Sequence, residues 1–294
     1  MTGKLPDFII IGAMKSATST LQEQLALQPG IFMSDPKEPN FFSDDSRYEK
    51  GMEWYSGLFK TAPDGCLLGE ASTHYTKLPN YPHTVKRLKE HLPEGRFIYV
   101  MRHPVNRLVS HYIHEWTMGV YQCGLDEAIE SYPELVDYGQ YAMQLKPFID
   151  TYGWESVLPV FFDRMISNPQ SELERICRFI GYQGEPHWVQ GQKASNVSSE
   201  RIRRFPLYST LIESSAATWF RRTLVPQALR DRVKKRLTMQ KRPTLHDDQQ
   251  KRLEEIFDRD LATLSKWLGK EINCSNFKTV TAETSLNWVK SNNG

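Results

Sequence analysis

The sequence has few cysteines, no long apolar run and almost no excess of charge of one sign. Its four cysteines, Cys66, Cys123, Cys177 and Cys274, lie far apart and form no CxxC pair. This spacing excludes a typical zinc ribbon and argues against a disulfide scaffold in a chain of 294 residues. No apolar run approaches the roughly 18–20 residues that a membrane helix needs, so we expect no transmembrane segment. The 37 Lys+Arg residues against 35 Asp+Glu leave a net charge of +2, and no overall field favours nucleic acid as a partner.

The first twelve residues, MTGKLPDFIIIG, contain one lysine and an apolar stretch of four residues. That stretch is too short for the apolar region of a signal peptide, so we interpret it as a buried strand and expect a cytoplasmic protein. The composition, 39% hydrophobic and 24% charged, is typical of globular proteins. The length permits one large α/β domain. We predict a single domain over residues 1–294, with a basic helical insertion at about 201–242.

The chain alternates between two kinds of pattern. Four short apolar segments are interpreted as buried strands, and they lie at 7–12, 66–69, 96–101 and 156–162. The first, third and fourth are rich in Ile, Val, Phe and Tyr and carry little charge, which is typical of strands buried on both faces of a sheet. Helical spacing of apolar residues is found at 18–27, 104–118, 140–152, 169–181 and 247–268. The alternation predicts an α/β fold of three layers, in which helices cover both faces of a central parallel sheet.

The most informative segment is GAMKSATST, at 12–20, between the first predicted strand and the first predicted helix. Lys15 brings a full positive charge to this loop. Small or hydroxyl-bearing residues follow it: Ser16, Ala17, Thr18, Ser19 and Thr20. Converging backbone N–H groups at a helix N-terminus bind anions, so the loop predicts a P-loop-like site for phosphate or sulfate, with an ordinary tight turn as the alternative. The loop has neither the GxxxxGK[ST] nor the GxGxxG pattern.

A second candidate anion site follows the strand at 96–101. Arg102 stands at the carboxyl end of that strand, along the edge where ligands of open α/β sheets bind. Its planar guanidinium suits a phosphate dianion, although a structural ion pair is an equal alternative for Arg102 alone. Ser110, on the helix that follows, could bring its hydroxyl to the same anion. Two anion sites on neighbouring strands indicate a ligand with two separated phosphates.

Together these segments resemble the sulfotransferase superfamily that uses 3′-phosphoadenosine 5′-phosphosulfate (PAPS). The resemblance is closest to soluble, bacterial-type relatives of the carbohydrate branch, which includes the heparan sulfate N- and O-sulfotransferases. The segment DFIIIGAMKSATSTL is similar to the family's 5′-phosphosulfate loop, and YVMRHPVNRLVSHY to its 3′-phosphate motif. PKEPNFF at 36–42, GEASTHY at 69–75 and GQY at 139–141 resemble further landmarks. The similarity covers roughly residues 5–182 and 243–272.

The resemblance implies roles for particular residues. Lys15 to Thr20 would hold the 5′-phosphosulfate, with Lys15 stabilising the charge on the bridging oxygen, and Arg102 and Ser110 would bind the 3′-phosphate. Glu38 matches the residue assigned as catalytic base in the O-sulfotransferases. The product would be adenosine 3′,5′-bisphosphate. We expect no metal, since the sequence has no HExxH motif or clustered carboxylate ligands.

Two histidines remain as alternative bases. His114 stands four residues after Ser110, where the N-sulfotransferases place a catalytic histidine, and His74 lies in the GEASTHY block. Lys37, Glu38, His74 and Tyr75 are predicted to line the acceptor cleft. Ala71 stands where the O-sulfotransferases carry a lysine.

We therefore predict a PAPS-dependent sulfotransferase that acts on a hydroxyl of a carbohydrate or glycosylated small molecule by in-line displacement. The alternatives are an N-sulfotransferase acting on an amino sugar, a small-molecule P-loop kinase, and a non-catalytic protein that binds a nucleotide or an anionic glycan. The basic stretch at 221–242 is either a solvated helical face or a wall for an anionic acceptor or membrane surface. The oligomeric state stays open.

Overall fold

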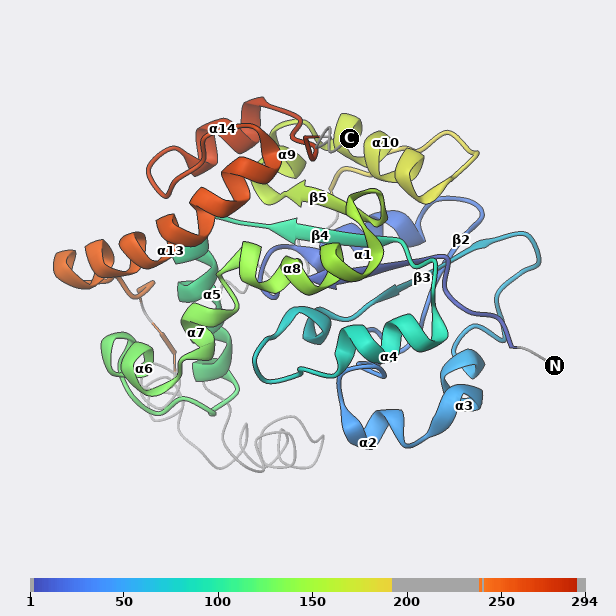
Figure 1. Ribbon diagram of the computed structural model, residues 1–294, viewed down its shortest axis with the longest axis horizontal. Coiled ribbons are helices and arrows are strands. Elements are labelled where there is room, and N and C mark those ends of the chain that lie inside the picture. The colour runs from blue at the N-terminus through green and yellow to red at the C-terminus, as the bar shows by residue number, and fades with distance from the viewer. Residues whose placement is uncertain (1–2, 192–237, 240, 290–294) are drawn as a thin grey trace, which may run out of the picture.

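A parallel sheet of five strands forms the centre of the computed structural model, which describes residues 3–191, 238–239 and 241–289 (Figure 1). In spatial order the strands are β2 (Ile31–Met33), β3 (Leu67–Ala71), β1 (Phe8–Gly12), β4 (Phe97–Met101) and β5 (Val157–Phe161). All neighbouring pairs are parallel. Their carboxyl ends therefore lie at one edge of the sheet, and the predicted α/β class is confirmed.

Among the strands of the described residues, β2 is the one that the sequence pattern did not predict. It has three residues, which is too short for a period-two or continuous apolar pattern to stand out. It pairs with β3 in the register Ile31 to Leu67. The strand predicted at 66–69 is shifted and continues to Ala71, so its end lies closer to the predicted acceptor residues than expected.

Helices cover both faces of the sheet, and each face has its own hydrophobic core. On one face pack α1 (Thr18–Ala26) and α10 (Pro169–Ile180), through residues such as Leu21, Leu25 and Ile176. The other face carries the larger core, under α3 (Gly51–Gly57), α4 (Thr84–His91), α5 (Pro104–Thr117), α8 (Tyr141–Tyr152) and α13 (Asp247–Leu268). In Figure 1, α8 lies in front of the sheet, and α4 lies below β3 in this view.

The remaining short elements lie around this frame. They are α2 (Asp45–Tyr48), α6 (Leu125–Ser131), α7 (Glu134–Asp137), α9 (Phe162–Ser167), α14 (Phe277–Glu283) and the 3-10 turns at Thr73–Thr76 and Trp154–Ser156. In Figure 1 the arrowheads of β4 and β5 point toward the side of the molecule where α5 and α13 lie. The carboxyl edge of the sheet is thus the edge from which α5 leaves β4.

Local signals in the sequence set several helix ends. Pro104 and Pro169 occupy the first positions of α5 and α10, where proline costs no helical hydrogen bond. Gly181 ends α10 in the left-handed conformation. The start of α8 is held from a distance, because the Asp260 carboxylate on α13 accepts hydrogen bonds from Ala142 N (2.9 Å) and Met143 N (3.0 Å).

The outer edge of β5 is closed by side chains. The indole Nε1 of Trp288 donates to Val157 O at 2.6 Å, and Nη2 of Arg175 donates to Pro159 O at 2.6 Å. Pro159 has no N–H to offer. The polar backbone of this edge strand is therefore largely satisfied within the chain.

Most of the predicted basic insertion at 201–242 lies outside the described residues, and so does nearly all of the stretch at 221–242 for which a membrane contact was considered. Within the part of the chain that the structure describes, no helix is long and apolar enough to span a membrane.

Candidate active site

The loop after β1 has the backbone shape of an anion site. Lys15 (φ 67°) and Ala17 (φ 69°) both adopt the left-handed conformation, which turns successive N–H groups inward. Ala13 N donates to Val100 O at 2.8 Å and Ser16 N to Ala13 O at 3.2 Å, so the loop is fixed to β4 and curled on itself. Directly behind it α1 begins at Thr18 with its positive N-terminal end.

Gly12 is required where the loop leaves the strand. Its φ is 154°, and a Cβ added there would lie 2.1 Å from Thr76 Oγ1 and 2.9 Å from the ring of Tyr99. The Thr76 hydroxyl already donates to Ile11 O at 2.7 Å. The close approach of these groups holds the loop against the segment that follows β3.

One hydroxyl inside the loop lacks a partner. Ser16 is fully buried, and its Oγ has no hydrogen-bond partner among the described residues. Buried polar atoms nearly always have a hydrogen-bond partner. A bound oxyanion would supply one by accepting a hydrogen bond from the Ser16 hydroxyl. The residues present therefore fit a phosphate or phosphosulfate group at this loop.

The two predicted anion sites lie side by side. Arg102 Nη1 donates to the backbone O of Lys15 at 3.3 Å, and the guanidinium lies 4.5 Å from the ring centroid of Phe162 on α9. The backbone N of Arg102 donates to the Tyr141 hydroxyl at 3.2 Å, and that hydroxyl donates to Arg102 O. Burial lowers the pKa values of Lys15 and Arg102, and for Lys15 the charges of Glu115 and Glu38 oppose the effect.

Glu38 stands beside the same loop. Its carboxylate accepts a hydrogen bond from Thr73 Oγ1 at 3.1 Å and lies 3.8 Å from Lys37 Nζ. Lys37 Nζ in turn donates to Ser19 Oγ at the start of α1. The chain Glu38–Lys37–Ser19 connects the predicted base to the predicted phosphosulfate loop.

The backbone around Glu38 is held in an unusual shape. Glu38 (φ 55°) and Asn40 (φ 52°) are left-handed residues that are not glycine, on either side of Pro39. Glu38 N donates to Ala71 O at 3.0 Å and Asn40 N to Ser72 Oγ at 3.0 Å. Strain of this kind persists only where the surroundings enforce it, and it is concentrated at functional sites.

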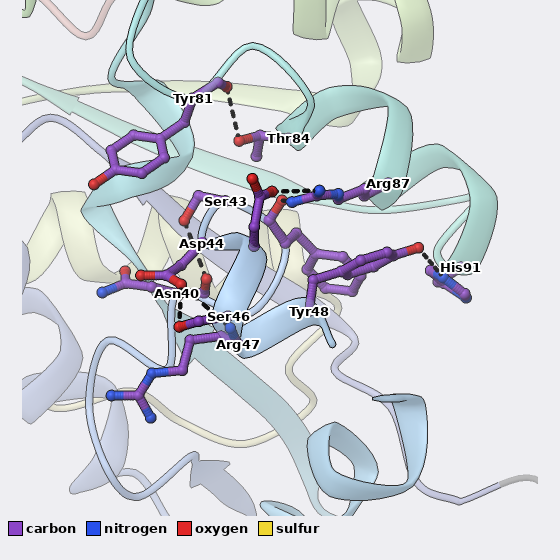
Figure 2. Close-up of polar contacts among 12 residues, drawn as sticks. Asn40, Ser43, Asp44, Ser46, Arg47, Tyr48, Tyr81, Thr84, Arg87 and His91 are labelled. Carbon is purple, nitrogen blue, oxygen red and sulfur yellow. Dashed lines mark hydrogen bonds and ion pairs between the residues drawn. The ribbon is translucent and has the colours of Figure 1, made fainter. Parts of the chain in front are cut away.

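The segment after Glu38 is anchored to α4, as Figure 2 shows. Ser43 Oγ donates to Asn40 O at 3.1 Å, and the Asp44 carboxylate caps α2 by accepting from Arg47 N at 3.2 Å. Tyr48 and His91 share a hydrogen bond of 2.9 Å between their side chains. These contacts keep the Glu38 loop in place from its far side.

Sequence reasoning missed Lys77. It is only 8% exposed and follows the 3-10 turn after β3, and its Nζ lies 5.6 Å from the ring centroid of Tyr138. Burial lowers the pKa of Lys77 to about 8, while the charges of Glu38 and Glu115 raise it. The signal in the sequence was its position two residues after the GEASTHY block. The sequence analysis assigned only the histidine and tyrosine of that block, His74 and Tyr75, to the acceptor cleft.

Both candidate histidines are half-buried, and burial lowers the pKa of each imidazole. Burial lowers the pKa of His74 to about 4, and the charge of Lys77 lowers it further; its ring stacks on Tyr81 at 4.9 Å. Burial also lowers the pKa of His114 to about 4, together with the charges of Lys15 and Lys77. Both imidazoles are therefore neutral at pH 7.

The remaining predicted site residues, Ser110 and Tyr75, make no hydrogen bond or ion pair with Lys15, Glu38 or Arg102 among the described residues. Ser110 is half-buried on α5, and no hydrogen bond or ion pair joins it to another predicted site residue among those described. Tyr75 is 2% exposed and its hydroxyl accepts from Phe42 N at 3.4 Å, so it packs beneath the Glu38 loop. Within the described ranges, no three His, Cys, Asp or Glu side chains are grouped to hold a metal ion.

Comparison with known proteins places this chain in a family. Residues 5–270 match the family model described as "Sulfotransferase domain", and the chain belongs to that family. The resemblance to the sulfotransferase family that was inferred from the sequence is thereby confirmed.

One curated protein is similar to this chain over more than half of its length. Heparan sulfate glucosamine 3-O-sulfotransferase 6 of Mus musculus is 29% identical over 187 residues, which are 60% of this chain and 53% of that protein. The chain thus spans about half the length of the curated relatives it matches.

Two solved structures share the fold. The sulfotransferase of Alicyclobacillus acidocaldarius is 21% identical, with a TM-score of 0.65 over 92% of this chain and 98% of its own. Mouse sulfotransferase SULT7A1, in complex with PAP, is 15% identical, with a TM-score of 0.50 over 89% of this chain and 85% of its own.

Proposed function

We propose that this protein transfers the sulfuryl group of PAPS to a hydroxyl of a carbohydrate or glycosylated small molecule. The observation that supports the proposal most is the contact between Arg102 Nη1 and the Lys15 backbone O, because the two predicted anion sites are then close enough for one ligand to reach both. The family supports the donor, and the heparan sulfate relatives support a carbohydrate acceptor.

The residues divide the binding of the donor between them. The N–H groups of the loop, the Lys15 ammonium and the Ser16 hydroxyl would hold the 5′-phosphosulfate, and Arg102 the 3′-phosphate. When bound, PAPS supplies an activated sulfuryl group on a phosphate leaving group. Ser110 stays a predicted partner of the 3′-phosphate on the strength of the family motif.

Lys15 and Glu38 would do the main chemical work. Lys15 places a positive charge where negative charge grows on the leaving oxygen, a form of stabilisation that is large in a water-poor site. Glu38 takes the proton from the acceptor hydroxyl, and Thr73 Oγ1 fixes its carboxylate at 3.1 Å. Burial lowers the pKa values of His74 and His114 to about 4, and both stay alternative bases.

The acceptor would approach over Glu38, between Lys37, Lys77 and His114. Lys77 supplies a cation near the end of β3, the strand whose last residue is Ala71, where the related O-sulfotransferases carry a lysine. We propose that Lys77 performs the corresponding acceptor contact from six residues further along. His74 would stand at the side of this cleft, stacked on Tyr81.

A single incubation tests the proposal. The full chain is mixed with PAPS labelled in the sulfuryl group and with neutral sugars, uronic acids, amino sugars and phenols, and the products are located by mass. Label on a sugar oxygen is the expected result, with the Lys15→Met variant as the inactive control. Label on the nitrogen of an amino sugar would make the protein an N-sulfotransferase, and no transfer to any sugar would overturn the proposal.

The proposed compartment is the cytoplasm. All four cysteines are free thiols in the structure, which is the usual state in a reducing compartment. Fractionation of the cells that produce the chain would test this placement, and recovery with the membranes would contradict it.

A further inference from the structure

Tyr141 belongs to the GQY segment at 139–141, and the proposed reaction assigns it no role. It is the first residue of α8 and is fully buried. Its hydroxyl makes two hydrogen bonds with one residue: it donates to Arg102 O and accepts from Arg102 N at 3.2 Å. A hydroxyl can donate and accept at once, so the phenol closes a clamp on the backbone of Arg102.

The clamp acts at the point where Arg102 leaves the sheet. Arg102 follows the last residue of β4, where the ladder of hydrogen bonds ends and the backbone needs other partners. With its backbone fixed, the side chain is aimed by two further contacts, the Phe162 ring at 4.5 Å and Lys15 O at 3.3 Å. Three elements therefore determine where the guanidinium lies.

Tyr141 is itself rigid. The Asp260 carboxylate holds the backbone of the next two residues at 2.9 and 3.0 Å. The Tyr99 ring packs against the Tyr141 ring at 6.0 Å in an edge-on arrangement. Burial raises the pKa of Tyr141 to about 12, so its hydroxyl keeps the proton that it donates.

We propose that Tyr141 is a positioning residue that couples the two anion subsites, by holding Arg102 where its guanidinium bridges the phosphosulfate loop and the 3′-phosphate. The inference rests on the proposed function, since it takes Arg102 as the reader of the 3′-phosphate. Tyr141 does not need to touch the donor for this role.

The test measures discrimination between two nucleotides by titration calorimetry. Wild type and Tyr141→Phe are each titrated with adenosine 3′,5′-bisphosphate and with adenosine 5′-phosphate. Removing the hydroxyl should lower the affinity ratio of the two ligands about tenfold, the loss expected for a pair of hydrogen bonds, while the affinity for the 5′-phosphate changes less than about twofold. The ratio distinguishes positioning from a general loss of structure, which would weaken both ligands alike.

Two further variants sharpen the result. In an Arg102→Ala background, Tyr141→Phe should not change the ratio, because the arginine that it positions is gone. The matched control is Tyr138→Phe, which removes a phenol whose bond goes to Asn80 Oδ1 at 2.9 Å, and it should leave the ratio as in wild type.

The outcomes separate the two claims. If wild type prefers the bisphosphate and Tyr141→Phe keeps that preference, or if its effect persists without Arg102, the coupling is refuted while the proposed function stands. If wild type shows no preference at all, the assignment of Arg102 fails and the inference fails with it.

Discussion

The guanidinium of Arg102 reaches back to the backbone oxygen of Lys15, 3.3 Å away, across 87 positions of sequence. The contact exists because β1 and β4 are neighbouring parallel strands whose carboxyl ends meet. It sets the distance between the two anion subsites, so the predictions below concern the residues on either side of it.

Arg102→Ala should weaken binding of adenosine 3′,5′-bisphosphate about tenfold to hundredfold, the usual cost of losing hydrogen bonds to a charged group. Binding of adenosine 5′-phosphate should change little, because the loop at Lys15 is intact. Calorimetry on both ligands measures the effect, with exposed Arg47→Ala as the control. Equal losses for the two nucleotides would mean that Arg102 does not read the 3′-phosphate.

Glu38→Gln should reduce turnover about 10²- to 10⁴-fold, the range that general bases contribute. Affinity for adenosine 3′,5′-bisphosphate should be unaffected, since the amide keeps the size of the side chain and can still accept from Thr73. Initial rates with saturating donor measure the first effect, and calorimetry the second. Unchanged turnover would move the base to His114 or His74.

Lys77→Met should raise the acceptor KM about tenfold, in line with one charge-assisted hydrogen bond, and leave nucleotide affinity unchanged. Methionine retains most of the buried stem, so the fold should survive. The same change at Lys146, which is exposed and paired with Asp150, is the control. A variant with normal acceptor kinetics would exclude Lys77 from the cleft.

Acid should destabilise the fold through its histidines. Burial lowers the pKa values of His74 and His114 to about 4 from the ordinary 6.5. Between those values the unfolded chain binds more protons than the folded one, so the free energy of unfolding falls as the pH falls. Thermal melts should show a lower Tm at pH 5 than at pH 7. His114→Gln should reduce that difference, and exposed His83→Gln should not; identical pH dependence in all three proteins would contradict this account.

The sequence was most informative where structure is local. The apolar runs that became β1, β4 and β5 are buried on both faces, and burial of that kind leaves an unbroken pattern. The anion-binding loop at Lys15 could also be predicted from local sequence, because a strand, small residues and a helix follow one another directly. Three-residue β2 left no such pattern.

Contacts between segments that are far apart in the sequence could not be predicted from local patterns. The hydrogen bonds between the Tyr141 hydroxyl and the Arg102 backbone join residues 39 positions apart. The sequence around either residue does not predict this contact. Lys77 is a site candidate only because the loop after β2 and the end of α5 bring Glu38 and Glu115 near it. Tyr75 was expected in the cleft and is a core residue, since sequence gives no direction for a side chain in a 3-10 turn.

The indole of Trp288 and the guanidinium of Arg175, bonded to the β5 carbonyls, have a consequence for behaviour at high concentration. A second polypeptide that tried to extend the sheet there would have to displace both side chains and would meet a proline with no donor. Fibrous self-association from this border is accordingly disfavoured.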